Sequence, residues 1–430
     1  MIEKREDVRG RALLVGVACP GLMDFDNSDA DTMAELAELV KTAGGETVLT
    51  AMQNRHSPDP RTFIGEGKCA ELKQMISDNQ IDLVIFDNEL SPSQGRALEE
   101  ALSCRVIDRN ALILDIFADR ASTAEGKLQV ELAQYQYLLP RLTGMWSHLV
   151  RQTAAGGSSP IGTRGPGETQ LETDRRHIRR KIQKLTEDLT AVRRVRATQR
   201  SRREKTEIPL ICIIGYTNAG KSTLLNALTG ADVHAADRLF DTLDPTTKLL
   251  HTDLLGDVLI SDTVGFIRKL PHHLVDAFRA TLEELSYADV LVHVIDASDE
   301  NWRLQAEVVE KLANELGAAE TPRIVVFNKC DKLRDDRLPR ETDALYCSAL
   351  RGVGLDALIE RICQVLGQRL RQVAFLLPYD AAQTLDLLYR DANVKKTEYM
   401  PEGIAVEAIV DERTYGRIRD FLPEGENGTL

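Results

Sequence analysis

One glycine-rich stretch limits what this chain can fold into more than any other feature: Gly215-Tyr216-Thr217-Asn218-Ala219-Gly220-Lys221-Ser222. The apolar residues 210–214 before it predict a buried strand, and residues 223–228 after it predict a helix. In that context the glycines let backbone N–H groups surround a phosphate, and the helix N-terminus adds a partial positive charge. The lysine of the pattern can reach the β- and γ-phosphates, and the serine hydroxyl can bind Mg²⁺. The stretch therefore predicts a phosphate-binding loop that uses Lys221 and Ser222.

Three more polar motifs follow predicted strands within residues 206–367, which we assign to one nucleotide-binding domain. In Asp262-Thr263-Val264-Gly265 the aspartate can hold Mg²⁺ through water, and the glycine N–H can contact a γ-phosphate. In Asn328-Lys329-Cys330-Asp331 the aspartate can accept two hydrogen bonds from guanine that adenine cannot donate. Ser348-Ala349 is placed to help hold the base. Because α/β sheets bind ligands at the carboxyl ends of their strands, the ordered set predicts a site for GTP and GDP.

A polar loop follows the phosphate loop, and its sequence is Phe240-Asp241-Thr242-Leu243-Asp244-Pro245-Thr246-Thr247. Its threonines are candidates to complete the Mg²⁺ shell beside Ser222. Spacing alone does not choose among Thr242, Thr246 and Thr247.

Residues 1–117 alternate apolar strand patterns with helical patterns, which predicts an N-terminal domain with a parallel α/β sheet. Its most pointed local feature is Ile64-Gly65-Glu66-Gly67-Lys68, a glycine-rich loop that opens a helix. Two interpretations stay open. A phosphate of RNA or of a nucleotide binds at that helix N-terminus, or the loop is a plain turn between a strand and a helix.

Residues 118–205 show two heptad-spaced series, which predict an antiparallel coiled-coil hairpin. The first series is Leu128, Leu132, Tyr135, Leu139 and Leu142, and the second is Ile178, Ile182, Leu185, Leu189 and Val192. Between residues 175 and 205 thirteen Lys and Arg face three acidic residues, a local charge of +10 in a chain of formal net charge −13. Such segregation indicates a surface for a phosphate backbone. A solvated coiled-coil face is the alternative interpretation.

The connection between the two hairpin helices, residues 144–167, is rich in glycine. Trp146, Arg151 and Arg164 lie at or near its tip, and an aromatic ring with arginines suits single-stranded RNA. The alternative for Trp146 is a role as an anchor under the loop.

Residues 368–430 predict a small C-terminal α+β module without a catalytic constellation, so the chain divides into four domains. Seven scattered cysteines have no paired or metal-ligand spacing, which indicates reduced thiols. No apolar run is long enough to span a bilayer, so we expect a cytoplasmic protein that is at most peripherally associated with membranes. We also expect a monomer.

The quoted motifs resemble the HflX family of GTPases, as do two further segments. These are residues 162–172, Gly-Thr-Arg-Gly-Pro-Gly-Glu-Thr-Gln-Leu-Glu, and residues 126–132, Gly-Lys-Leu-Gln-Val-Glu-Leu. The resemblance covers about residues 10–365. It implies a GTPase that binds the large (50S) ribosomal subunit and helps to dissociate or rescue stalled ribosomes. It also implies that the hairpin and its loop reach the peptidyl-transferase region of the rRNA.

Site roles carry over from this resemblance motif by motif. Gly215 to Ser222 would form the phosphate loop, and Ser222 and Thr242 would bind Mg²⁺. Phe240 to Asp244 would form the first switch and Asp262 to Gly265 the second, with Lys221, Thr242 and Gly265 as the catalytic set. Asn328 to Asp331 would recognise guanine, and Ser348, Ala349 and Leu350 would support the base. Cys330 departs from the aliphatic residue that is usual in the family, and the hairpin loop around residues 154–160 is longer than is typical.

Phe266 follows the second switch, where Ras-like enzymes have the glutamine that orients the attacking water. Because phenylalanine cannot hydrogen-bond water, we expect slow intrinsic hydrolysis that a partner accelerates. Asn218 lies where similar GTPases bind K⁺ at the phosphates, so K⁺ is a further expected cofactor. Two rival functions remain: a nucleotide-gated anti-association factor that acts by occupancy, and an ATP-driven rRNA remodeller that uses the N-terminal domain.

Overall fold

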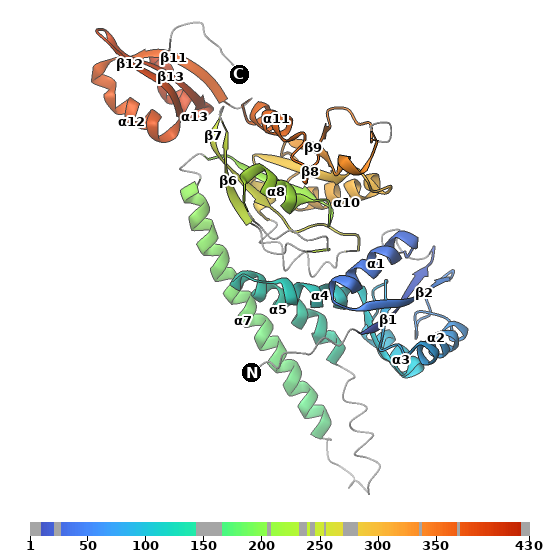
Figure 1. The fold of residues 1–430 in the computed structure, drawn as a ribbon. Coiled ribbons are helices and arrows are strands. Elements are labelled where there is room, and N and C mark those ends of the chain that lie inside the picture. The colour runs from blue at the N-terminus through green and yellow to red at the C-terminus, as the bar shows by residue number, and fades with distance from the viewer. Residues whose placement is uncertain are drawn as a thin grey trace. The chain divides into compact units, whose positions relative to one another are not determined.

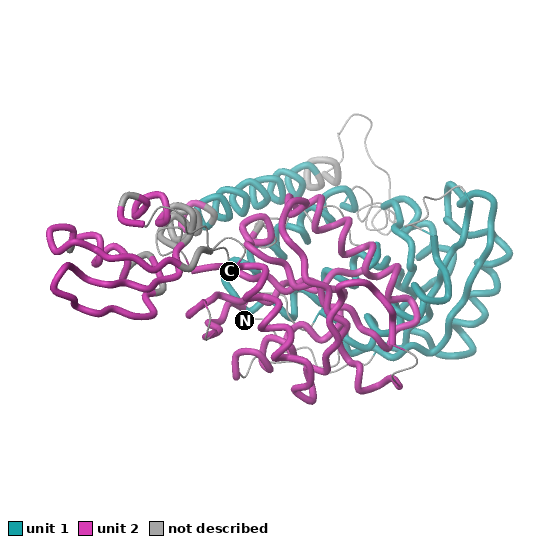
Figure 2. Tube along the Cα trace, turned by 90° about the horizontal axis from the view of Figure 1, so that it is seen from above, with its two compact units in different colours: residues 1–192, 237–243, 268–279 teal, residues 193–236, 244–267, 280–430 magenta. Residues whose placement is uncertain are grey.

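The computed structural model describes residues 10–20, 27–142, 166–203, 208–231, 239–240, 246–252, 255–269, 283–334, 338–367 and 370–422. The chain divides into two compact units (Figure 2). The first unit holds residues 1–192 with the segments 237–243 and 268–279, and the second holds residues 193–236, 244–267 and 280–430.

The first unit contains a four-stranded parallel sheet in the order β2-β1-β3-β4 (Figure 1). Its strands are β1 (Arg11–Ala18), β2 (Glu46–Asn54), β3 (Leu83–Phe86) and β4 (Arg105–Asp108). Its helices are α1 (Ala30–Thr42), α2 (Glu66–Asn79), α3 (Pro92–Leu102) and α4 (Arg109–Arg120). The parallel α/β sheet that the alternating patterns predict is confirmed.

Side-chain caps fix where α3 and α4 begin. Ser91 and Gln94 form a reciprocal capping box before α3, each side chain bonding the backbone N–H of the other residue. Asp108, the last residue of β4, accepts a hydrogen bond of 2.9 Å from the N–H of Ala111 and so begins α4. The sequence patterns did not predict α4, because residues 112–117 are almost all apolar and show no one-sided helical pattern.

The predicted hairpin consists of α5 (Ala124–Arg141) and α7 (Pro166–Arg203). In the first unit one hydrophobic cluster joins them, formed by Leu128, Leu132 and Tyr135 of α5 with Ile182, Leu185 and Leu189 of α7. These are heptad positions, so the spacing identified the contact face correctly. Residues 143–165 lie outside the described residues, and with them Trp146, Arg151 and Arg164.

The second unit contains a six-stranded sheet in the order β10-β9-β8-β5-β7-β6, in which only β6 is antiparallel to its neighbour. The strands are β5 (Leu210–Gly215), β6 (Thr246–Thr252), β7 (Gly256–Asp262), β8 (Val290–Asp296), β9 (Arg323–Asn328) and β10 (Leu345–Tyr346). Its helices are α8 (Lys221–Thr229), α10 (Trp302–Glu315) and α11 (Leu355–Gly367). After β5 the chain forms β6 and β7 on one side of β5 and then β8 on its other side. The loop after β5 therefore lies at a topological switch point, where the direction of the strand order reverses.

A three-stranded antiparallel sheet follows, in the order β11-β13-β12. It consists of β11 (Leu370–Leu377), β12 (Asn393–Met400) and β13 (Gly403–Asp411), with the helices α12 (Ala382–Asp391) and α13 (Glu412–Ile418). Short 3₁₀ turns are η2 (Glu283–Tyr287), η3 (Cys330–Lys332), η5 (Tyr379–Ala381) and η6 (Arg419–Phe421). The module has the order strand, helix, strand, strand, helix, which agrees with the predicted α+β class. Within the described ranges, no helix combines the length and apolar character needed to cross a membrane.

Candidate functional site

The glycine-rich stretch turns between β5 and α8, and its glycines are required by close contacts. A Cβ atom on Gly215 would lie 2.3 Å from the carbonyl oxygen of Val294 in β8. Gly220 has φ +91°, and a Cβ there would lie 2.3 Å from Nδ2 of Asn328. Asn218 has φ +62°, a left-handed conformation that asparagine tolerates better than most residues. The turn therefore requires glycine at positions 215 and 220, as the sequence pattern of a phosphate-binding loop does.

Lys221, the first residue of α8, is buried under this loop. Its ammonium donates a hydrogen bond of 2.8 Å to the carbonyl oxygen of Tyr216. Burial lowers the pKa of Lys221 to about 8, although the nearby Asp262 carboxylate opposes the shift. The site therefore holds a poorly compensated cation, and an anionic phosphate is the ligand that would stabilise it.

Ser222 and Asp262 meet where a metal ion would be expected. The Ser222 hydroxyl donates to Oδ2 of Asp262 at 2.5 Å, and Asp262 is fully buried at the end of β7. A hydroxyl and a carboxylate oxygen are hard ligands of the kind that Mg²⁺ takes together with water and phosphate oxygens, so these residues fit the ion. Across the parts of the chain described, no three His, Cys, Asp or Glu side chains form a metal-binding group.

Gly265 approaches the phosphate loop so closely that a side chain would not fit. A Cβ there would lie 2.9 Å from Cγ2 of Thr217 and 3.0 Å from Nζ of Lys221. The segment before it is fixed by Thr263, whose hydroxyl donates to the carbonyl oxygen of Ile213 at 2.7 Å. Val264 is buried. The second predicted motif and the phosphate loop therefore come together as the sequence predicts.

Phe266 is bonded to the phosphate loop through its backbone. Its N–H donates to the carbonyl oxygen of Gly215 at 3.2 Å, and its own carbonyl accepts from the N–H of Thr217 at 2.8 Å. The ring is only 2 % exposed. A buried ring cannot hydrogen-bond an attacking water, so this position lacks the group that a Ras-like enzyme uses.

Two residues of the Asn328–Asp331 motif contact the phosphate loop directly. Nδ2 of Asn328 donates to the carbonyl oxygen of Ala219 at 2.9 Å. The ammonium of Lys329 donates to the carbonyl oxygen of Asn218 at 2.6 Å and pairs with Asp296 at 2.7 Å. The Asn328–Asp331 loop, which would recognise the base, therefore stabilises the loop that would hold the phosphates.

Asp331 is held by the third motif. The hydroxyl of Ser348 donates to Oδ1 of Asp331 at 2.6 Å, and this hydrogen bond is the main reason why the pKa of Asp331 lies below its usual value. The N–H of Ala349 donates to Oδ1 of Asn328 at 3.0 Å. An ionised aspartate in a fixed orientation can accept the two hydrogen bonds that guanine offers.

The other residues predicted for the nucleotide site make no described contact with the phosphate loop. Cys330 begins η3, and its thiol donates to the carbonyl oxygen of Phe327 at 3.2 Å. Leu350 is 81 % exposed, so its side chain is available to cover a base. Phe240 is buried, with its ring edge-on to Phe117 of α4 at 4.7 Å between centroids. Asp241, Thr242, Leu243 and Asp244 lie outside the described residues.

The other glycine-rich candidate, Gly65, has its backbone N–H already engaged. Gly65 precedes α2, and its N–H donates to Oε1 of Gln53 at 3.1 Å. This contact favours the plain turn over a phosphate contact at that helix start.

The sequence analysis did not single out Asp296, which contacts the Asn328–Asp331 motif. Its carboxylate pairs with Lys329 and accepts hydrogen bonds from the N–H and hydroxyl of Ser298. A usable signal was present, because Asp296 ends an apolar strand in the same way as Asp262 and Asn328.

Sequence reasoning also missed a buried charge cluster in the first unit. Asp87, at the end of β3, pairs with Arg109 at 2.9 Å and with Lys269, and both cations are almost fully buried. Arg109 also pairs with Glu35, and Arg268 pairs with Asp29 at 3.1 Å. Burial alone would raise the pKa of Asp87, but Arg109 and Lys269 hold it below its usual value. Nothing in the spacing of these residues predicts their contact.

Comparisons with known proteins identify relatives of this chain among GTP-binding GTPases. Three family models match consecutive parts of the chain: the GTP-binding GTPase N-terminal region at residues 30–118, the GTP-binding GTPase middle region at 120–203, and the 50S ribosome-binding GTPase at 210–329. The chain is similar to the GTPase HflX of Caldanaerobacter subterraneus subsp. tengcongensis, with 46% identity over 412 residues, 96% of this chain and 94% of that protein. It is also similar to the GTPase HflX of Escherichia coli K12, with 43% identity over 390 residues, 89% of this chain and 90% of that protein. Among solved structures, the complex of SsGBP with GDP is 26% identical, covers 83% of this chain and 98% of its own, and has a TM-score of 0.46.

Proposed function

Because the chain belongs to the HflX family of GTPases, we propose that it binds the large ribosomal subunit and helps to separate stalled ribosomes, with GTP hydrolysis controlling its release. The chain is a GTP-binding protein that hydrolyses GTP. Ribosome binding, subunit separation and the roles of single residues go beyond that statement.

The observation that carries the proposal is the charge of α7. The apolar residues Ile178, Leu185 and Leu189 are buried, whereas Arg176 and Arg180, two residues before and two residues after Ile178, are exposed. One stripe of α7 thus packs against α5 and leaves the arginines available to solvent. Arginines along an exposed helix bind phosphate backbones and release counterions as they do so. The match of residues 210–329 to the 50S ribosome-binding GTPase model supports ribosomal RNA as the source of those phosphates.

At the nucleotide, we assign the phosphates to the loop from Gly215 to Ser222 and the guanine to Asp331. Lys221 would hold the β- and γ-phosphates, and the N–H of Gly265 would contact the γ-phosphate. Ser222 and Thr242 would hold Mg²⁺, which neutralises charge on the phosphates when it is bound. K⁺ held at Asn218 would add positive charge where other enzymes use an arginine. The chain itself orients the phosphates and the base, and the ribosome would complete the orientation of the attacking water.

The decisive experiment measures GTP turnover with and without purified large ribosomal subunits in K⁺ buffer. We expect strong acceleration by the subunits, because Phe266 leaves the free enzyme without a water-orienting group. If the protein binds GTP normally but the subunits do not accelerate GTP turnover, the ribosome-activated model is wrong.

A matched pair of charge variants tests the α7 surface. Arg176→Glu/Arg180→Glu should weaken subunit binding and reduce the dependence of log affinity on log salt by about 1 for each lost phosphate contact. The control, Arg61→Glu/Lys73→Glu, makes the same charge change at exposed residues outside α7. Equal effects of the two pairs would mean that only the net charge matters.

The buried Phe266 also favours a second candidate function, a nucleotide-gated factor that separates subunits by occupancy and hydrolyses GTP only for recycling. A non-hydrolysable GTP analogue distinguishes the two. Full subunit separation with the analogue would support occupancy, and separation only with GTP would support a role for hydrolysis in the separation itself.

A further inference from the structure

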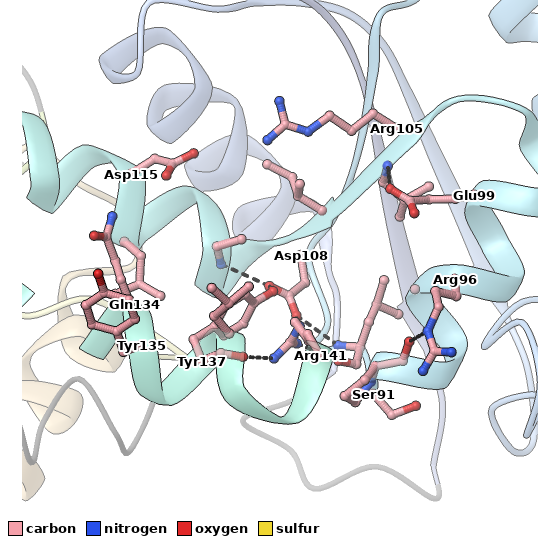
Figure 3. Close-up of a pocket in the computed structure, with 18 of the residues that line it drawn as sticks. Ser91, Arg96, Glu99, Arg105, Asp108, Asp115, Gln134, Tyr135, Tyr137 and Arg141 are labelled. Carbon is pink, nitrogen blue, oxygen red and sulfur yellow. Dashed lines mark hydrogen bonds and ion pairs between the residues drawn. The ribbon is translucent and has the colours of Figure 1, made fainter. Parts of the chain in front are cut away.

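A cavity of about 760 Å³ lies beside β4 in the first unit (Figure 3). Its walls come from the edge strand β4 and from α3, α4 and α5. The volume falls within the range of ordinary ligand pockets. Neither the nucleotide chemistry nor the α7 surface uses this cavity.

The backbone of β4 presents one open side to this cavity. In the sheet order β2-β1-β3-β4, β4 has a neighbour only at β3, and the described residues pair no strand with its other side. The N–H of Val106 donates to Oε1 of Glu99 at 3.2 Å, so it points away from β3. Because N–H and C=O groups alternate in direction along a strand, the carbonyl of Val106 and the N–H of Asp108 point the same way. Glu99 thus takes the place that a carbonyl of another strand would take.

The lining of the cavity is apolar at its base and charged at its rim. Leu90, Val106 and Leu114 are buried at the base. Arg96 and Arg105 come from α3 and β4, and Asp115 comes from α4 (Figure 3). Glu131 comes from α5. Acidic groups on this rim would repel a phosphate backbone, so a nucleic acid suits the cavity poorly. A peptide with apolar, acidic and basic side chains would match it.

The cavity is held open by rigid contacts and by a glycine. Asp108 accepts hydrogen bonds from the Tyr137 hydroxyl at 2.8 Å and from Arg141 at 3.0 Å. Arg141 also donates to the carbonyl oxygen of Leu90 at 2.8 Å, which ties α5 to the start of α3. Gly95 lies inside α3, where glycine is unfavourable, and a Cβ there would meet no atom within 4 Å. No local contact requires glycine, and its effect is to leave the cavity clear.

We propose that this cavity binds an extended peptide segment of a partner protein, which adds a strand to the sheet at β4. The peptide backbone would accept from the N–H of Asp108 and donate to the carbonyl of Val106, and a peptide carbonyl would replace Glu99 as the acceptor for the N–H of Val106. Its apolar side chain would pack at the base, an acidic side chain would pair with Arg96 or Arg105, and a basic one with Asp115 or Glu131. Grooves between an edge strand and a neighbouring helix bind peptides in this way in other proteins.

The test starts from a phage-displayed library of random heptapeptides selected on the full-length protein, and the enriched peptide is then synthesised with a fluorescent label. We expect Gly95→Leu to weaken its binding at least tenfold, because the new side chain fills the cavity. Gly416→Leu is the matched control, since Gly416 lies in α13 and also has no atom near its Cβ position. Basal GTP turnover of both variants should equal that of the wild type, because neither glycine belongs to the nucleotide motifs.

Backbone pairing makes a second, independent prediction. N-methylation of alternate peptide residues should abolish binding at one set of positions and not at the other, and hydrogen exchange at the Asp108 amide should slow when the peptide binds. The proposal is overturned if no peptide is enriched over an unrelated protein, or if Gly95→Leu and Gly416→Leu bind equally well. Tolerance of N-methylation at every position, or displacement of the peptide by oligouridylate, would overturn it as well.

Discussion

The ammonium of Lys329 lies 2.7 Å from the carboxylate of Asp296, so the Asn328–Asp331 motif and the end of β8 share a partly buried ion pair. The same ammonium donates to the carbonyl oxygen of Asn218 in the phosphate loop. Asp296 therefore orients a lysine that links the two halves of the nucleotide site, although we expect it to touch no nucleotide.

Asp296→Asn should weaken GDP and GTP binding by roughly tenfold, since a charge-assisted contact of about 1.5 kcal/mol is lost. Fluorescent nucleotide titration would measure the change. Glu300→Gln, at an exposed acid in the same loop, is the control and should bind normally. Equal affinities for Asp296→Asn and the wild type would show that Lys329 needs no carboxylate partner.

Nucleotide binding should be coupled to proton uptake by Lys221. Its pKa in the ligand-free protein is about 8, below the ordinary value, so above about pH 8 part of the population is neutral. Anionic phosphates favour the ammonium and raise that pKa, so binding takes up a proton at about pH 8.5 and takes up almost none at about pH 6.5. GTP affinity should accordingly fall as the pH rises through 8.

Calorimetry in two buffers with different ionisation enthalpies measures this uptake. The apparent binding enthalpy should depend on the buffer at the higher pH and not at the lower. A buffer-independent enthalpy at both values would contradict a lowered pKa for Lys221.

Gly265→Ala should abolish most GTP hydrolysis and leave GDP binding intact. The added Cβ would lie 2.9 Å from Thr217 and 3.0 Å from the Lys221 ammonium, so the segment must move away from the γ-phosphate position. Removal of one transition-state contact typically lowers turnover by a factor of about 100. Single-turnover hydrolysis together with GDP titration separates the two effects, and normal turnover would mean that the N–H of Gly265 makes no contact in the transition state.

Replacement of K⁺ by Na⁺ should slow GTP hydrolysis if Asn218 holds the ion. Asn218→Ala should then be slow in both salts, whereas its GDP affinity should change little. A wild-type rate that is the same in K⁺ and Na⁺ would rule out the ion at this position.

The sequence predicted those parts of the molecule that depend on short spacings. The phosphate loop, Asp262–Gly265 and Asn328–Asp331 each follow a strand directly, so their positions at the sheet edge follow from local patterns alone. The Asp87 cluster could not be predicted, because Asp87 and Arg109 are 22 residues apart, and Asp87 and Lys269 are 182 apart. No periodicity relates residues that tertiary packing alone brings together, and the apolar α4 shows the same limit for a single helix.

The Asp87 cluster gives the last prediction, which concerns stability. Asp87→Ala leaves Arg109 and Lys269 buried without a shared carboxylate, which should lower the free energy of unfolding of the first unit by about 3–5 kcal/mol. Because the folded-state pKa of Asp87 is depressed, the stabilisation is present above the unfolded pKa of about 4 and is lost as the pH falls through the folded value. Urea unfolding of the full-length protein, monitored by amide exchange in β3, should show a much lower free energy of unfolding for Asp87→Ala than for the wild type at about pH 7. That difference should shrink below about pH 4.

Asp82→Ala is the control and should cost much less, because Asp82 is exposed and its carboxylate accepts a hydrogen bond from the backbone N–H of Arg11. A double variant, Asp87→Ala/Lys269→Met, should recover part of the loss, because it removes one of the two uncompensated cations. If the double variant is no more stable than Asp87→Ala, the Lys269 charge does not contribute to the energy of the cluster.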